Sequence, residues 1–296
     1  MYFGQVLTAM VTPFDHNGEV DFNATRTLVN YLIANGSDGL VVAGTTGESP
    51  TLTTEEKVEL FKFVVEAVNG RVPVIAGTGS NNTRASISLT KLAEGAGVDG
   101  IMLVTPYYNK PSQEGLFQHF QAIAESTKLP VMLYNIPGRS AVNMTVETIV
   151  RLSEINNIVA VKEASGDLDA MAEIIGQTPD DFTLYSGDDG LTIPVLAIGG
   201  AGVVSVASHI IGNKMQEMIN SFKNGKLQDA ASAHRALLPI MKALFTAPSP
   251  SPVKGALNIL GVNVGGVRLP MVSLNDTENK ELQRILKLSN LIEESI

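Results

Sequence analysis

The sequence predicts an α/β fold, a (β/α)8 TIM barrel with a C-terminal helical appendage. Short apolar, β-branched runs alternate with amphipathic segments of helical period, which is typical of repeated βα units. Eight such runs are present, and the alternation stops near residue 222. A chain of 296 residues suits one large barrel with additional elements. We therefore expect a catalytic barrel over residues 1–222 and a helical domain over residues 223–296.

Most of the strand candidates are continuously apolar, as expected for parallel strands that are buried on both faces. In chain order they are Val6–Pro13, Gly39–Ala43, Val72–Gly77, Gly100–Thr105, Val131–Asn135, Ile158–Lys162, Thr183–Ser186 and Gly202–Val206. Barrels of this kind carry their active sites at the carboxyl ends of the strands. The residues that end or follow these runs are therefore the candidate site.

Amphipathic segments with apolar residues at helical spacing lie between the strand candidates. They are Thr54–Val68, Ser80–Glu94, Gln113–Ser126, Thr145–Ser153 and Asp167–Gly176. The tail contains helical patterns and no strand. Its segments are a helix over Leu227–Phe245, a Pro/Ser hinge over residues 247–252, and helices near Val253–Leu260 and Asn279–Glu294.

Composition and charge exclude several classes of function. The net charge of −9, without a clustered basic face, argues against nucleic-acid binding. The chain has no cysteine, which excludes disulfide scaffolds and thiol catalysis. No secretory signal is visible at the N-terminus, so we expect a cytoplasmic protein. The uncharged stretch Gly190–Gly212 is broken by Pro194 and several glycines into a short helix, a turn and a strand, so we expect no membrane span.

We expect neither a metal nor an organic cofactor. The four histidines show no ligand spacing, and each is expected to be structural: His16, His119, His209 and His234. No dinucleotide or Walker motif is complete. Glycines near the last two strands lie where such barrels often bind phosphate, but no basic residue accompanies them, which disfavours a phosphosugar enzyme.

Lys162 closes the sixth strand candidate, which places its side chain at the barrel mouth. Surrounding Val and Ile side chains would desolvate its ammonium, lower its pKa and leave a fraction as the free amine that attacks a ketone. Considered alone, a lysine at a strand end is more often exposed to solvent. Two other strand ends favour the catalytic interpretation.

The first is the turn Gly44-Thr45-Thr46-Gly47-Glu48, which follows the second strand candidate. Its glycines allow close approach of the backbone to a ligand, and its amides and hydroxyls can bind an anion. An ordinary βα turn is the alternative interpretation.

The second is the end of the fifth strand candidate. Tyr134 can move protons near a bound carbonyl, and Arg139 can bind a carboxylate, although a barrel plug and a surface charge are the alternatives. Tyr107 and Tyr108, after the fourth strand, form either a binding platform or an ordinary rim. Together the lysine, the phenol and the anion-binding turn predict a Schiff-base lyase or aldolase.

At these positions the chain closely resembles the dihydrodipicolinate synthase family, within the N-acetylneuraminate lyase superfamily. The matching motifs lie at residues 44–49, 72–79, 105–111, 134–139, 161–164, 186–189 and 268–270. The resemblance covers essentially the whole chain. It implies a barrel with C-terminal helices, in agreement with the pattern of strands and helices.

The resemblance implies a role for each site residue. Lys162 would form an imine with pyruvate, and Thr45 and Thr46 would hold the pyruvate carboxylate. Tyr134 would carry protons to the imine and from the enamine methyl group. Thr46 would link Tyr134 to Tyr108 of a neighbouring subunit, so we expect a homodimer or a homotetramer.

The same resemblance implies the second substrate. Arg139 would bind the carboxylate of L-aspartate 4-semialdehyde, while Gly187 and Val204 would contribute backbone near the pyruvate. The product would be 4-hydroxy-tetrahydrodipicolinate, on the route to diaminopimelate and lysine. Apart from the covalent lysine imine, no cofactor is implied.

Two alternatives remain at this point. A sugar-acid lyase, acting on N-acetylneuraminate or a 2-keto-3-deoxy sugar acid, would use the same lysine imine, but such lyases usually place a non-basic residue at the position of Arg139. A non-catalytic, ligand-sensing barrel is the other alternative. It would require loss of Lys162, Tyr134 or Thr46, and all are present.

Many members of the family bind lysine as a feedback inhibitor at a dimer interface. The corresponding positions here are Ser49, Pro50, Thr54, Lys57, Asn81, Ala85 and Tyr107. Thr54 and Lys57 replace histidines of the sensitive pattern, and Ala85 replaces a glutamate. Lys57 would repel a lysine ligand and Ala85 cannot accept its ammonium, so we expect weak or absent inhibition.

Overall fold

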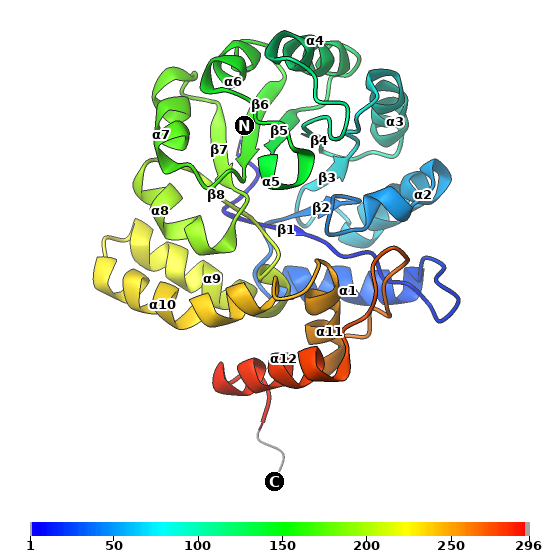
Figure 1. The fold of residues 1–296 in the computed structure, drawn as a ribbon, viewed down its shortest axis with the longest axis vertical. Helices are drawn as coiled ribbons and strands as arrows, with labels where there is room; N and C mark the ends of the chain where they lie inside the picture. The colour runs from blue at the N-terminus through cyan, green and yellow to red at the C-terminus, as the bar shows by residue number, and fades with distance from the viewer. Residues whose placement is uncertain (1, 294–296) are drawn as a thin grey trace.

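Within residues 2–293, which the computed structural model describes, eight parallel strands close into a barrel in sequence order (Figure 1). The strands are β1 Val6–Ala9, β2 Gly39–Val42, β3 Val74–Gly77, β4 Gly100–Val104, β5 Val131–Asn135, β6 Ile158–Glu163, β7 Thr183–Ser186 and β8 Gly202–Ser205. The fold predicted from the sequence is confirmed.

Helices connect each strand to the next and surround the barrel (Figure 1). They are α1 Phe22–Ala34, α2 Thr54–Val68, α3 Thr83–Gly95, α4 Gln113–Ala124, α5 Pro137–Ser140, α6 Val146–Ser153, α7 Leu168–Gln177, α8 Thr192–Ala197 and α9 Ser208–Lys223. Side-chain caps set several starts. Asn82 accepts from the backbone N of Ala85, so α3 begins at Thr83 and not at Ser80 as the sequence predicted.

The first strand is shorter than the predicted Val6–Pro13: the backbone N of Met10 still donates to Val41 of β2, but polar groups beyond Met10 have other partners. The backbone N of Val11 donates to His209 Nε2, and Thr12 Oγ1 donates to the carbonyl of Gly47. The third strand begins at Val74, two residues later than predicted, after Pro73, which has no backbone N–H.

Side chains of the strands alternate between two apolar clusters. One cluster fills the barrel interior and consists of Phe3, Leu7, Ala9, Val41, Ile75, Met102, Met132, Tyr134, Ala160, Tyr185 and Val204. The other cluster lies between the strands and the helices around them. Because residues two apart share a face, Lys162 points into the barrel interior like Ala160.

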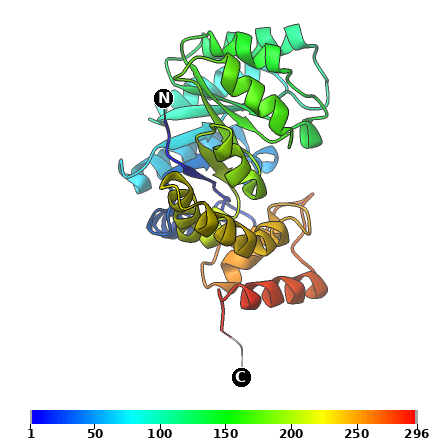
Figure 2. The ribbon, with the colours of Figure 1, turned by 90° about the vertical axis from the view of Figure 1, so that its left-hand side faces the viewer.

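The C-terminal segment adds three helices on one side of the barrel (Figures 1 and 2). These are α10 Leu227–Ala243, α11 Ser251–Ile259 and α12 Asp276–Leu288. The last helix starts three residues before the predicted Asn279, because Asn275 and Glu278 form a capping box, and the predicted end at Glu294 lies outside the described residues. The division into two domains at residue 222 stays a prediction, and α9 ends beside it at Lys223.

The uncharged stretch over residues 190–212 divides into α8, a turn, β8 and the start of α9, close to the predicted helix, turn and strand. No helix in the described part of the chain combines the length and apolar character needed to cross a membrane.

Candidate active site

The predicted catalytic lysine lies where two neighbouring strands present tyrosines. In the strand register Lys162 of β6 is the partner of Tyr134 on β5 and of Tyr185 on β7. Only 6% of Lys162 is exposed. Its Nζ lies 4.1 Å from the centroid of the Tyr134 ring, over the electron-rich face. The barrel therefore brings together two residues that are 28 positions apart in the sequence.

Burial is the main cause that lowers the pKa of Lys162 to about 8; the negative charge of Asp189 opposes this shift, and the positive charge of Arg139 contributes to it. An ordinary lysine is almost entirely protonated at neutral pH. With a pKa near 8, about a tenth of the side chains carry the free amine at pH 7. Lys162 is thus a usable nucleophile at physiological pH.

Asp189 is a buried carboxylate that the sequence did not single out for this role. It accepts hydrogen bonds from Ser205 Oγ and from the backbone N of Val206 and Ala207, the latter at 2.9 Å. Its charge raises the pKa of Lys162, so it stabilises the lysine in its protonated form. The signal available in the sequence was the pair Asp188-Asp189 directly after the seventh strand.

Tyr134 is buried at the end of β5, and burial raises the pKa of its phenol to about 12. The charge of Arg139 and a hydrogen bond with the Thr45 side chain both act in the opposite direction. The phenol is therefore neutral at physiological pH and can donate its proton to a base beside it.

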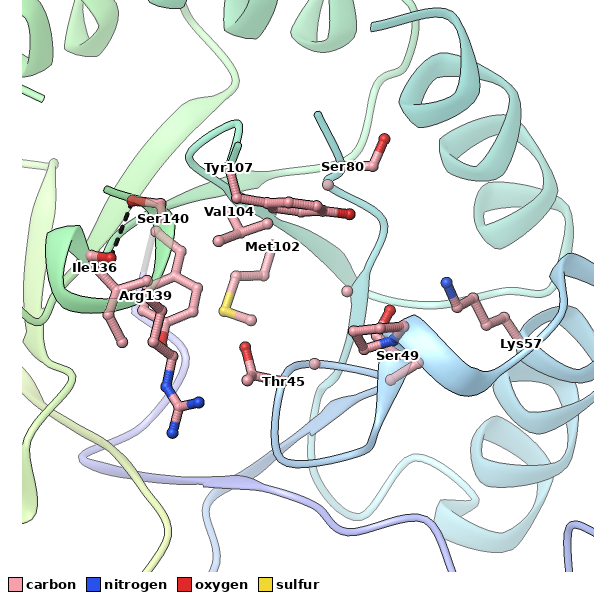
Figure 3. A pocket seen from close by; sticks show the side chains of 16 residues that line it. Thr45, Ser49, Lys57, Ser80, Met102, Val104, Tyr107, Ile136, Arg139 and Ser140 are labelled. Carbon is pink, nitrogen blue, oxygen red and sulfur yellow. Dashed lines mark hydrogen bonds between the residues drawn. The ribbon is translucent and has the colours of Figure 1, made fainter. Parts of the chain in front are cut away.

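Thr45 contacts the Tyr134 phenol, whereas the family resemblance implied that Thr46 would make this link. Thr45 also lines the cavity at the barrel mouth (Figure 3), whereas Thr46 is buried and is not among the lining residues. The structure therefore favours Thr45 as the neighbour of Tyr134.

The cavity at the barrel mouth has a volume of about 250 Å³. Tyr134, Thr45 and Arg139 line it together with Met102 and Val104 (Figure 3). A cavity of this size accommodates a small keto acid.

Arg139 lies on the short helix α5 and borders a second cavity of about 600 Å³, beneath α10. No ion pair within residues 2–293 holds its exposed guanidinium. It is available for the carboxylate of a ligand between the two cavities.

Because Gly187 has no side chain, the end of the Lys162 side chain can lie directly beside it. An added Cβ at this position would lie 3.1 Å from Lys162 Cε and 2.6 Å from the Cβ of Ala164. Gly187 borders the second cavity, as expected for a residue near the substrates. Val204 lies in the middle of β8, and its side chain packs in the barrel interior with Tyr134.

Four of the seven positions that correspond to the family's binding site for the inhibitor lysine line the same cavity as Thr45. They are Ser49, Pro50, Lys57 and Tyr107 (Figure 3). Asn81 lies beside them, and its Nδ2 donates to the carbonyl of Tyr107 at 3.1 Å. Thr54 and Ala85 are exposed in the first turns of α2 and α3 and lie outside the lining.

Tyr108 is 90% exposed and has a left-handed backbone with φ of 74°. Such a conformation is uncommon for a bulky residue. The loop that carries Tyr108 is bound to the preceding loop, between β3 and α3, by Asn109, whose Nδ2 donates to the carbonyl of Asn81 at 2.9 Å. Tyr108 therefore projects from this chain and contributes nothing to the cavity lining.

Among residues 2–293, no group of three His, Cys, Asp or Glu side chains is arranged to hold a metal ion. Two of the histidines expected to be structural are buried. His209 accepts from the backbone N of Val11, and His119 Nδ1 hydrogen-bonds Thr83 Oγ1 at 2.9 Å.

Comparison with known proteins gives matches along nearly the whole chain. The model of the Dihydrodipicolinate synthetase family matches residues 2–289. The chain is 64% identical to a 4-hydroxy-tetrahydrodipicolinate synthase of Bacillus velezensis over 97% of its own length and 99% of that protein's. It is 63% identical to the protein of that name in Bacillus subtilis, with 95% and 98% covered.

Solved structures show the same likeness. A dihydrodipicolinate synthase from Bacillus anthracis superposes with a TM-score of 0.96 at 62% identity, covering 97% of this chain and 99% of that one. The enzyme from Cyanidioschyzon merolae, solved with lysine bound, gives a TM-score of 0.96 at 49% identity, covering 98% and 99%.

Proposed function

The chain belongs to the Dihydrodipicolinate synthetase family, and we propose that it condenses pyruvate with L-aspartate 4-semialdehyde through an imine on Lys162. Relatives at more than 60% identity bear the name 4-hydroxy-tetrahydrodipicolinate synthase. The family and the synthase activity expected from the sequence are thereby confirmed. The observation that supports the imine is a buried lysine with a pKa near 8, placed over Tyr134 at the barrel mouth.

The first half of the proposed reaction takes place on Lys162. The free amine attacks the ketone carbon of pyruvate, and the resulting carbinolamine loses water to give the imine. Tyr134 donates its proton to the departing hydroxyl, and its phenolate then accepts a proton from the methyl group to give the enamine. Thr45 and Thr46 hold the pyruvate carboxylate from the turn after β2.

The second half brings in the aldehyde. The enamine carbon attacks the aldehyde carbon and forms the new carbon–carbon bond, while the aldehyde oxygen takes up a proton. The amino group of the former aldehyde then attacks the imine carbon, closes the ring and releases Lys162 as the amine. Arg139 holds the carboxylate of the aldehyde, because its unpaired guanidinium lies between the two cavities.

Each of these steps uses an amine, a phenol or a guanidinium that the chain itself supplies. We therefore propose that the reaction needs neither a metal nor an organic cofactor. The cytoplasmic location expected from the sequence stays a prediction.

The exposed Tyr108 supports self-association. We propose that Tyr108 reaches the proton relay of a neighbouring subunit, since its side chain is 90% exposed in the single chain. At least a homodimer would then be needed for full activity. One structural relative is described as a monomeric variant of dihydrodipicolinate synthase, which bears on that protein alone.

Inhibition by lysine is proposed to be weak or absent. Lys57 lines the cavity at the corresponding position, where its positive charge would repel a lysine ligand. Ala85 offers no carboxylate for the ligand's ammonium.

The test is pyruvate consumption in the presence of L-aspartate 4-semialdehyde, comparing wild type with Lys162→Ala and with Lys91→Ala. Lys91 is exposed on α3 and serves as the matched control. We expect turnover and borohydride-trapped pyruvate to be lost in Lys162→Ala and kept in Lys91→Ala. Turnover that survives in Lys162→Ala would refute the imine, and a wild type that ignores this aldehyde would refute the choice of second substrate.

A further inference from the structure

Glu48, the last residue of the turn that carries Thr45, is bound by residues of the C-terminal segment. Glu48 directly follows Gly47, is 3% exposed and has a left-handed backbone with φ of 56°. Ala43, at the start of the turn, is also left-handed with φ of 52°. Non-glycine residues keep this conformation only where their surroundings hold them. The turn that presents Thr45 is therefore held in place at both ends.

Both carboxylate oxygens of Glu48 are engaged by residues that follow it by more than 200 positions. Lys254 Nζ lies 2.7 Å from Oε1, and each of the two side chains is 2% exposed. The backbone N of Arg268 donates to Oε2 at 2.9 Å. Lys254 Nζ also donates to the carbonyl of Gly266 at 2.6 Å. The C-terminal segment thus supplies the partners that a buried carboxylate requires.

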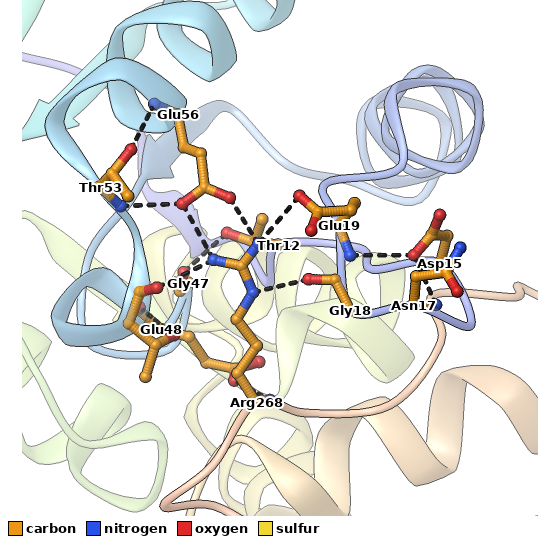
Figure 4. A network of polar contacts seen from close by, with 11 residues as sticks. Thr12, Asp15, Asn17, Gly18, Glu19, Gly47, Glu48, Thr53, Glu56 and Arg268 are labelled. Atoms are coloured by element: carbon orange, nitrogen blue, oxygen red, sulfur yellow. Dashed lines mark hydrogen bonds and ion pairs between the residues drawn. The ribbon is translucent and has the colours of Figure 1, made fainter.

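Arg268, whose backbone binds Glu48, also binds residues 51–56 and the loop that contains Gly18 through its side chain (Figure 4). Its guanidinium makes a bidentate pair with Glu56 on α2 and donates to the carbonyls of Thr51 and Gly18 at 2.8 and 2.7 Å. On the other side of the turn, Thr12 Oγ1 donates to the carbonyl of Gly47 at 2.7 Å. The segment carrying Arg268 is consequently fixed to the region that surrounds the catalytic turn.

A role limited to stability accounts poorly for a pair buried this deeply. Burying two charges removes them from water, and an apolar pair of similar volume is often as stable or more stable. A carboxylate that forms an ion pair with Lys254 and accepts a hydrogen bond from the backbone of Arg268 does define a position, however, and the adjacent turn must place the Thr45 hydroxyl against the Tyr134 phenol. A displacement of about 1 Å in such a contact can lower a rate roughly 100-fold.

We propose that Glu48, held by Lys254 and the backbone of Arg268, is a positioning residue that sets the Thr45 turn for pyruvate binding and proton transfer. The inference rests on the proposed function. It assigns a task to the C-terminal segment, which lies outside the barrel and supplies none of the proposed catalytic groups.

The test compares Glu48→Gln with Leu282→Ala, using pyruvate and L-aspartate 4-semialdehyde. Leu282 of α12 packs against α11, so its truncation lowers stability by leaving a cavity there, while Glu48 keeps both Lys254 and the backbone of Arg268 as partners. Active sites are counted by borohydride trapping of pyruvate, and kcat is expressed per trapped site. A loss of folded protein would then leave both kcat and KM unchanged.

We expect Glu48→Gln to raise KM for pyruvate and to lower kcat per site, each by roughly tenfold or more, while Leu282→Ala changes neither. Wild-type kcat and KM in Glu48→Gln would overturn the inference. If Glu48→Gln does not fold, the double variant Glu48→Gln/Lys254→Met, which leaves no unpaired buried charge, provides the same comparison. A wild type without turnover would instead count against the proposed function.

Discussion

Replacing Gly187 by alanine tests how closely the barrel mouth is built around the catalytic lysine. An added Cβ would lie 2.6 Å from the Cβ of Ala164 and 3.1 Å from Lys162 Cε. Carbon atoms in contact are normally about 3.5–4.0 Å apart, so the neighbours must separate by roughly 1 Å. The backbone resists this movement, because the Gly187 N–H donates a 2.7 Å hydrogen bond to the carbonyl of Glu163.

Ala164 directly follows β6, so moving its Cβ away shifts the end of the strand that carries Lys162, and the flexible end of the lysine must give way as well. A catalytic group displaced by about 1 Å can lower the rate roughly 100-fold, which corresponds to about 2.7 kcal/mol in activation free energy. We therefore expect Gly187→Ala to lower both kcat and the rate of imine formation by about this factor, with the fold retained.

The assay combines borohydride trapping of pyruvate, followed by mass spectrometry, with turnover on both substrates. Gly176→Ala is the matched control, since Gly176 lies in α7 and an added Cβ there meets nothing within 4 Å. A folded Gly187→Ala protein whose trapping rate and kcat stay within about twofold of wild type would refute the steric reasoning.

Three further outcomes are expected. Only the free amine of Lys162 attacks pyruvate, and its pKa is about 8. The rate of imine formation should therefore rise from about one tenth of its maximum at pH 7 to about nine tenths at pH 9. A rate that stays flat over this range in rapid-quench trapping would contradict the lowered pKa. Thr45→Val should reduce kcat roughly 100-fold, because it removes the hydroxyl beside the Tyr134 phenol, whereas Thr46→Val should mainly raise KM for pyruvate. Steady-state kinetics that show the reverse would indicate that Thr46 is the threonine that contacts Tyr134. Turnover should be unaffected by about 1 mM L-lysine because Lys57 lines the cavity, and a dose-dependent loss of rate below that concentration would disprove the expected insensitivity.

The positions of Lys162, Tyr134 and Arg139 could be predicted because each ends or follows an apolar strand. In a parallel barrel all such ends meet at one face, so residues from different strands come together without any further information. The direction of a side chain within a turn follows no such rule. The family resemblance implied Thr46 as the neighbour of Tyr134, and the structure places Thr45 there.

The burial of the Asp189 carboxylate likewise could not be predicted from the sequence. The sequence contains the adjacent pair Asp188-Asp189, and nothing in the pattern tells which carboxylate is buried. The hydrogen bonds from Ser205, Val206 and Ala207 decide it, and they come from the following strand and the turn after it. Only Asp189 is therefore enclosed where its charge acts on the pKa of Lys162.

The sequence by itself determined the barrel, the helical tail and the strand ends that carry the chemistry, because hydrophobic periodicity and motif spacing are local properties of the chain. The tertiary structure alone decided which threonine faces the phenol, how far burial lowers the pKa of Lys162, and that Glu48 is paired with Lys254. Each of these depends on contacts between residues far apart in the chain. Such contacts exist only after the barrel has closed and the C-terminal helices have packed against it.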